Sequence, residues 1–182
     1  NFAKLAIDAL INGGEVDFEE AYIYTDTPDD EYIYQGTKQL ISNPLILSNG
    51  DQISIQFGTT KSDEKNANQQ VSTDLINGIK FAIEQANSNL PTLDKITSIY
   101  IMATTNGKHS STSNHSNGTA VDISRINNKK MALSGVTNQI KELQKAFDNF
   151  TYIRENFGDG WASEAQNTLC GNFITCHVAV KD

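Results

Sequence analysis

The sequence of 182 residues is long enough for one domain, or for one domain with a small appendage. Its hydrophobic and charged fractions, 38% and 20%, are ordinary for a globular protein and exclude extensive disorder. A formal net charge of −8 without a basic stretch argues against nucleic acid or an anionic membrane surface as partner. No apolar run reaches the length of about 20 residues that spans a bilayer, so membrane insertion is not expected. The chain begins at Asn1 without an initiator Met or a basic-then-apolar leader, so we expect a processed product or a piece of a longer polypeptide.

The first 65 residues predict a short helix followed by short strands. Apolar residues on one face predict a helix over 2–12, which Gly13 and Gly14 end. Four β-rich runs separated by turn residues follow, at 21–24, 31–34, 44–47 and 52–57. The polar run 61–70 contains no large apolar residue and predicts a linker or long loop. We therefore assign residues 1–65 to a strand-rich N-terminal appendage and residues 66–182 to the main domain.

The main domain is predicted to contain two amphipathic helices. Ser72 can cap the first, which runs to about Asn87. Its apolar stripe consists of Leu75, Ile76, Ile79, Ala82, Ile83 and Ala86. The second begins at Thr137 and places Ile140, Leu143, Phe147 and Phe150 on one face.

Four strands are predicted around these helices. β-rich runs cover 96–104, 119–124, 151–155 and 173–180, and the loops 105–118 and 158–171 interrupt them. A turn is expected at Asn127 and Asn128. This order of elements predicts an α+β domain with an antiparallel sheet and flanking helices.

Three histidines and one aspartate are candidates for a metal site. His115 lies in a polar loop, Gly118 permits a tight turn, and Asp122 then falls inside an apolar strand. A buried, unpaired carboxylate costs several kcal/mol, so Asp122 requires a cationic partner, and no Lys or Arg lies in residues 119–123. Zn²⁺ is an economical partner, because two histidines and one carboxylate leave a fourth position open for water. Taken singly, each of His109, His115 and His177 is more often a surface or hydrogen-bonded residue than a ligand.

The run Ser113-Asn-His115-Ser-Asn-Gly118-Thr-Ala120-Val-Asp122 resembles a known motif. It is similar to the Ser-x-His-x-x-Gly-x-Ala-x-Asp motif of the zinc D-Ala-D-Ala carboxypeptidases and related cell-wall endopeptidases, a group that includes the signalling domain of hedgehog proteins. The stretch 107–124, with His109 six residues before His115, looks most like the hedgehog-like branch. The resemblance covers residues 71–182 and implies a hedgehog/DD-peptidase-like fold. It also implies that His115, Asp122 and His177 bind Zn²⁺.

The same resemblance implies further catalytic residues. In this family a Glu precedes the last histidine, and the nearest pattern puts it where this sequence has Ile174. The hedgehog-like arrangement puts it at the end of the preceding strand, where Glu155 stands, so Glu155 is our general base and Glu164 its rival. His109 would stabilise the oxyanion or orient the substrate, or it is a loop histidine that donates to a backbone carbonyl. Ser113 would position the substrate or the loop.

Two departures from the family limit what is implied about the substrate. D-Ala-D-Ala carboxypeptidases hold the terminal carboxylate of the substrate with an Arg ahead of the motif. Residues 103–107 contain no Arg, and Lys108 could substitute only as a point charge. Cys170 and Cys176 could close a small disulfide loop, or Cys176 could be a buried strand residue.

The resemblance therefore implies a hydrolase, a zinc metallopeptidase that acts on peptidoglycan peptide, with endopeptidase cleavage favoured over trimming of a free C-terminus. Such an enzyme would be secreted, extracellular or periplasmic, or it would be a phage lysin or part of a virion assembly. The alternative is a non-catalytic zinc-containing binding module or a virion structural module on the same fold.

Overall fold

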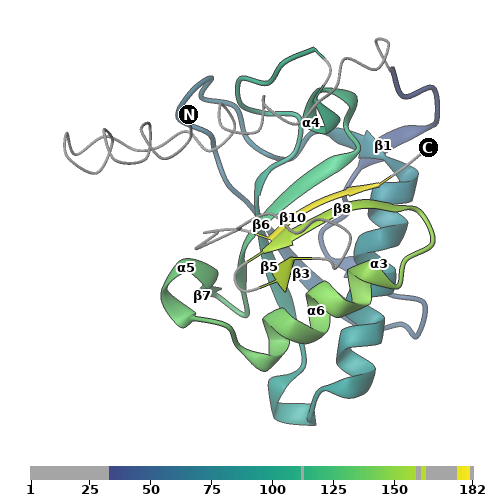
Figure 1. Cartoon of the computed structure of the whole chain (residues 1–182), viewed down its shortest axis with the longest axis vertical. Coiled ribbons are helices and arrows are strands. Elements are labelled where there is room, and N and C mark those ends of the chain that lie inside the picture. Colours follow the sequence, from purple (N-terminus) through teal and green to yellow (C-terminus); the bar gives the residue numbers. More distant parts are fainter. Residues whose placement is uncertain (1–32, 112, 159–160, 163–175, 181–182) are drawn as a thin grey trace. The chain divides into compact units, whose positions relative to one another are not determined.

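The computed structural model describes residues 33–111, 113–158, 161–162 and 176–180 (Figure 1). These residues belong to one compact unit, Ile33–Asp182. The helix expected over 2–12 and the strand expected over 21–24 lie outside the described residues. No helix within the described ranges is both long enough and apolar enough to cross a membrane.

A curled sheet forms the centre of this unit. Its strands follow the order β2 (Leu45–Ile46), β3 (Gln52–Phe57), β5 (Ser98–Ala103), β6 (Ala120–Ile126), β10 (Cys176–Val180), β8 (Ile153–Gly158) and β9 (Trp161–Ala162), and β7 (Lys129–Lys130) pairs with β6. A second, two-stranded sheet joins β1 (Lys38–Leu40) to β4 (Gln70–Ser72). Together with the helices below, these strands confirm the predicted α+β class.

The expectation of a purely antiparallel sheet is wrong. β3 runs parallel to β5, with Ile55 opposite Ile99, whereas the other recorded pairs of this sheet are antiparallel. Parallel neighbours need a long crossover, and here the chain passes through β4 and helix α3 (Thr73–Asn89) between the two strands. Because β3 precedes residue 65 and β5 follows it, both sides of the predicted domain boundary contribute to one sheet.

Helix α3 begins where the sequence predicts it. The Oγ of Ser72 accepts a hydrogen bond from the Leu75 N–H at 3.0 Å, which caps the first turn. The helix ends at Asn89 because Leu90 takes an extended backbone ahead of Pro91. The predicted apolar stripe is buried and consists of Leu75, Ile76, Ile79, Ala82, Ile83 and Ala86.

Helix α6 (Asn138–Asp148) packs beside α3 (Figure 1). Its cap is Thr137, whose Oγ1 accepts a hydrogen bond from the Ile140 N–H at 3.2 Å. Leu143 and Phe147 are fully buried. Phe150 lies beyond the last turn of the helix but still packs against the core. The second amphipathic helix is therefore confirmed.

Three short helices in the described part of the chain were not predicted. They are η2 (Thr92–Asp94), α4 (Asn114–Asn117) and α5 (Met131–Ser134). α4 lies inside the loop expected over 105–118. The turn at Asn127 and Asn128 is confirmed, since both residues have positive φ, 49° and 64°.

The two faces of the sheet differ in character. Val121, Ile123 and Val178 alternate onto the face that packs into the core with α3 and α6. Asp122 and His177 occupy the intervening positions of β6 and β10, so they lie on the opposite face. The sheet thus separates the apolar core from the candidate site.

Candidate metal centre

One short helix and two neighbouring strands bring the candidate ligands together. His115 lies in α4, where its N–H donates to the Oγ of the capping residue Ser113 at 3.2 Å. Gly118 ends α4 with a left-handed φ of 72°, and the chain then enters β6, which carries Asp122. β10 runs antiparallel to β6 and places His177 directly opposite Asp122. Directly opposite residues share a face, so Asp122 and His177 lie side by side, and α4 places His115 next to them.

The three side chains form one group, which we call the metal group because it could hold a metal ion. The ligand atoms of His115, Asp122 and His177 all lie within 4.8 Å of one another. His177 Nδ1 is 2.8 Å from Asp122 Oδ1, and His115 Nε2 is 3.6 Å from Asp122 Oδ2. The two imidazole nitrogens are 3.3 Å apart. The three residues predicted from the sequence as metal ligands therefore lie close enough together to hold a metal ion.

The orientation of the His115 ring is fixed by Thr104. His115 Nδ1 donates a hydrogen bond to the carbonyl oxygen of Thr104. This bond fixes the tautomer of the neutral form, with the proton on Nδ1, and that form would offer the Nε2 lone pair to a metal ion. Thr104 is itself buried, and its hydroxyl donates to the Ala67 carbonyl at 2.7 Å.

A buried amide, Asn106, supports this arrangement. Its Oδ1 accepts from the Thr104 N–H at 2.8 Å, and its Nδ2 donates to Thr60 Oγ1 at 3.2 Å. Sequence reasoning missed both Thr104 and Asn106. The sequence indicates Thr104 and Asn106 only as part of a polar run directly after a strand. Their partner Thr60 lies 46 positions from Asn106, so no local pattern links them.

The electrostatic environment keeps Asp122 ionised. Burial by itself would raise the pKa of this carboxyl group, but the charges and hydrogen bonds of the His115 and His177 imidazoles outweigh burial and lower the pKa well below its usual range. The Asp122 and His177 side chains keep 16% and 17% of their surface exposed, so a further ligand can reach the group from solvent.

No family model, curated protein or solved structure matches the chain. The geometry of His115, Asp122 and His177 is what indicates that this site could hold a metal ion.

His109 lies beside the metal group. Its ring stacks on that of His115, with centroids 4.5 Å apart and an interplanar angle of 8°. Its Nε2 lies 2.7 Å from the carbonyl oxygen of Asn106, which matches the alternative of a loop histidine donating to a backbone carbonyl. The structure therefore brings His109 to the site, and its catalytic role stays a prediction.

The two predicted substrate-binding residues lie in the same loop region. Ser113 caps α4 with its hydroxyl, which is the loop-positioning role that the sequence allows. Lys108 is exposed and directly precedes His109. Contact of either residue with a substrate stays a prediction.

The predicted general base, Glu155, lies in β8. Its backbone pairs with Ala179 of β10, and Phe157, two positions further, pairs with His177. Because alternate strand positions share a face, positions 155 and 177 lie on the same face of the sheet. The rival Glu164, as well as Ile174 and Cys170, lies outside the described residues.

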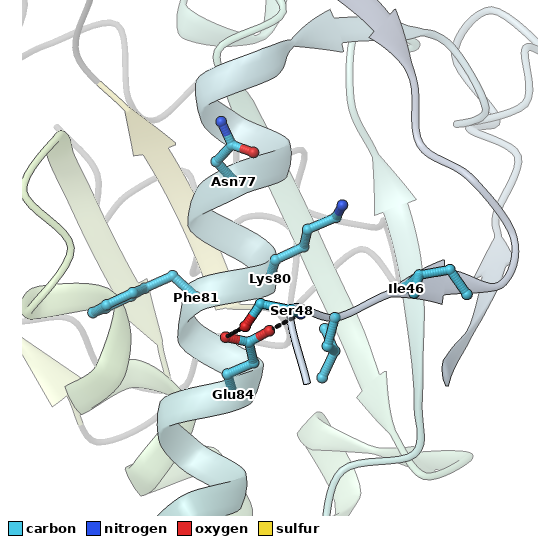
Figure 2. Close-up of a pocket in the computed structure, with 7 residues that line it drawn as sticks. Ile46, Ser48, Asn77, Lys80, Phe81 and Glu84 are labelled. Atoms are coloured by element: carbon cyan, nitrogen blue, oxygen red, sulfur yellow. Dashed lines mark hydrogen bonds between the residues drawn. The ribbon is translucent and has the colours of Figure 1, made fainter. Parts of the chain in front are cut away.

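A separate hollow of about 490 Å³ lies between α3 and the turn after β2. It is lined by Ile46, Leu47, Ser48, Asn77, Lys80, Phe81 and Glu84. Figure 2 shows Ser48 and Glu84 pointing toward each other: the Ser48 hydroxyl donates to the carboxylate at 2.7 Å, and the Ser48 N–H donates to it as well. None of the three candidate ligands lines this hollow. The bonds between Ser48 and Glu84 join the turn after β2 to α3.

Proposed function

We propose that this protein is a zinc-dependent peptidase that hydrolyses peptide bonds of bacterial peptidoglycan, with cleavage inside the peptide favoured over trimming of its C-terminus. The observation that carries the proposal is the meeting of His115, Asp122 and His177 in one group. These are the residues that the motif at 113–122 and the last strand imply as zinc ligands. A hedgehog/DD-peptidase-like arrangement of the α+β fold is part of the proposal.

The donor set suits Zn²⁺. A tetrahedral zinc ion with bonds of about 2.0–2.1 Å keeps its ligand atoms about 3.4 Å apart. The separations from His115 Nε2 to His177 Nδ1 and to Asp122 Oδ2, 3.3 Å and 3.6 Å, are close to that value. The 2.8 Å between His177 and Asp122 would widen with a small rotation of the carboxylate. Three protein ligands would leave the fourth position to water or substrate, as in catalytic zinc sites.

The chain's own residues would carry the remaining chemistry. Zn²⁺ bound here would supply a Lewis acid that activates water and polarises the scissile carbonyl. Glu155 would take the proton of the attacking water and pass it to the leaving amine, a contribution of roughly 10²–10⁴-fold. His109 would donate toward the carbonyl oxygen as negative charge develops there, and losing such a donor costs roughly 10²–10³-fold.

Purified peptidoglycan sacculi provide the test. We expect the zinc-loaded wild type to release peptide fragments that mass spectrometry identifies. Glu155→Gln should lower release roughly 10²–10⁴-fold with its zinc content unchanged, because it removes only the base. His177→Ala should lose both zinc and release.

The matched control is Glu142→Gln, which makes the same change of charge on α6, where a Gln can still accept the hydrogen bond from Asn89. Equal release by Glu155→Gln and wild type removes the base assignment. Absence of release by zinc-loaded wild type favours the non-catalytic binding or virion module instead.

A further inference from the structure

A bulge in β6 turns Arg125 toward the metal side of the sheet. Arg125 pairs with Tyr100 of β5, but the next pairing is made by Ile123, so Ser124 is an extra residue in the strand. Without a bulge, residues three positions apart would lie on opposite faces. With it, Arg125 returns to the face that carries Asp122. The burial pattern agrees, since Ile123 is buried while the other three residues of this stretch are only half-buried.

The guanidinium of Arg125 is held in place by an aromatic ring. It lies 4.5 Å from the centroid of the Tyr100 ring, and the side chain is half-buried. A guanidinium that stacks through its face keeps the N–H donors along its edge for other partners. Tyr100 thus orders a planar cation without using up its hydrogen-bonding capacity.

A second cation stands directly opposite the first. Lys130 of β7 pairs with Arg125 in the antiparallel register. Like charges in directly opposite positions destabilise a sheet. In the part of the chain that the structure describes, the recorded ion pairs include neither residue. Arg125 and Lys130 thus stand opposite each other without a recorded acidic partner, although the chain has a net charge of −8. This arrangement favours a site for an anionic ligand.

The distance to the metal group indicates which anion. Arg125 is three residues from Asp122 along β6. At roughly 3.3 Å per residue, their Cα atoms are at most about 10 Å apart. An extended peptide with its scissile carbonyl at the metal group would cover that distance in two or three residues. We propose that Arg125 and Lys130 bind a carboxylate of the peptide substrate two or three residues from the scissile bond. The planar fork of Arg125 fits both oxygens of a carboxylate.

This inference rests on the proposed peptidase function, and paired substrates test it. Soluble peptidoglycan stem peptides are prepared with free carboxylates and with the same carboxylates amidated. For the zinc-loaded wild type we expect kcat/KM to be about 10–100-fold higher on the free form, because only that form offers a charge-assisted bond. Arg125→Gln should lower the ratio most of the way toward one, because only the point charge of Lys130 then remains, and Arg125→Lys should restore part of it.

The matched control is Lys129→Gln, which removes an exposed cation one position from Lys130, opposite Ile126. It should keep the wild-type ratio. A ratio that Arg125→Gln leaves unchanged, or a wild type without preference, overturns the proposal. If circular dichroism shows that Arg125→Gln is not folded, Lys130→Gln provides the same comparison.

A binding measurement separates this inference from the peptidase proposal. Calorimetry of the two peptide forms with the zinc-loaded protein needs no turnover. If neither peptide is cleaved but the free form binds more tightly, and Arg125→Gln removes the difference, the peptidase proposal fails and the anion site stands. If the wild type binds both forms equally, the anion site fails whether or not cleavage occurs.

Discussion

At the residue scale, Asp63 holds together two loops beside the metal group. Its carboxylate accepts hydrogen bonds from the Thr60 hydroxyl, from the Lys65 N–H at 3.1 Å and from the Gly107 N–H at 2.9 Å. Gly107 is two positions ahead of His109, which stacks on His115. Asp63 therefore anchors the start of the loop that carries both histidines.

The charge of Asp63 predicts a pH dependence of stability. The Thr60 hydrogen bond, with those from Gly107 and Lys65, lowers the pKa of Asp63 from 3.8 to about 2. A lowered pKa in the folded state means that the carboxylate stabilises the fold fully above about pH 4, and that this contribution is lost as pH falls toward 2. We expect Asp63→Asn to flatten the fall in Tm between pH 4 and pH 2, measured by circular dichroism. Asp94→Asn, on η2, should keep the wild-type slope, and an Asp63→Asn slope equal to the wild type would contradict the assignment.

The candidate ligands could be predicted from the sequence, whereas Thr104 and Asn106, which hold His115 in place, could not. His115 and Asp122 lie in one local motif, and Asp122 is a carboxylate inside an apolar strand, which chemistry alone identifies as needing a partner. Thr104 and Asn106 act through carbonyls and amides of loops distant in the chain. Hydrogen bonds of that kind leave no local pattern, so only the folded chain reveals them.

At the scale of elements, the turn between α4 and β6 sets the spacing of two candidate ligands, His115 and Asp122. Gly118 takes a φ of 72°, and a Cβ placed there would lie 3.3 Å from the Gln70 carbonyl oxygen. The Gly118 carbonyl also accepts the Ser72 N–H at 2.8 Å, which joins this turn to the start of α3. The turn therefore packs against β4 and the start of α3, whose apolar side contributes to the core.

Replacing Gly118 should affect both stability and metal binding. We expect Gly118→Ala to lower the free energy of unfolding by about 1–2 kcal/mol, because a side chain is disfavoured in the left-handed region, and to weaken zinc binding, because the turn must shift. Gly50→Ala is the matched control: its φ is 87°, and no atom lies within 4 Å of the added Cβ. Urea unfolding and a zinc titration against a competing chelator measure the two effects. Equal zinc affinity in both variants would show that the turn does not set the ligand spacing.

The elements that could be predicted are those defined by local chemistry. α3 follows from its cap and its three-to-four spacing, and β3 follows from alternating apolar residues that match its bounds, Gln52–Phe57. The parallel pairing of β3 with β5 could not be predicted, because it depends on how the crossover through α3 packs. The short elements β1 and β7 have two or three residues each, too few for a periodic pattern.

At the scale of the whole molecule, the metal group joins parts of the chain that are far apart. His115 and His177 are 62 positions apart, and they approach each other only because β10 pairs with β6. An unfolded chain cannot hold these side chains in place, so an ion bound here would favour the folded state. Metal binding should therefore be visible as a change in the stability of the whole described unit.

Zinc should raise the thermal stability of the wild type. At free zinc about 100-fold above the dissociation constant, preferential binding to the folded state contributes about 2.7 kcal/mol, which corresponds to a rise in Tm of roughly 5–10 °C for a chain of this size. A chelator should reverse the rise, and acid should reduce it because protons compete for the imidazoles. His177→Ala should lose the rise, whereas His109→Ala should keep most of it, since His109 stacks on a ligand without being one of the three. Differential scanning calorimetry at fixed free zinc provides the measurement, and a rise of wild-type size in His177→Ala would place the zinc at other residues.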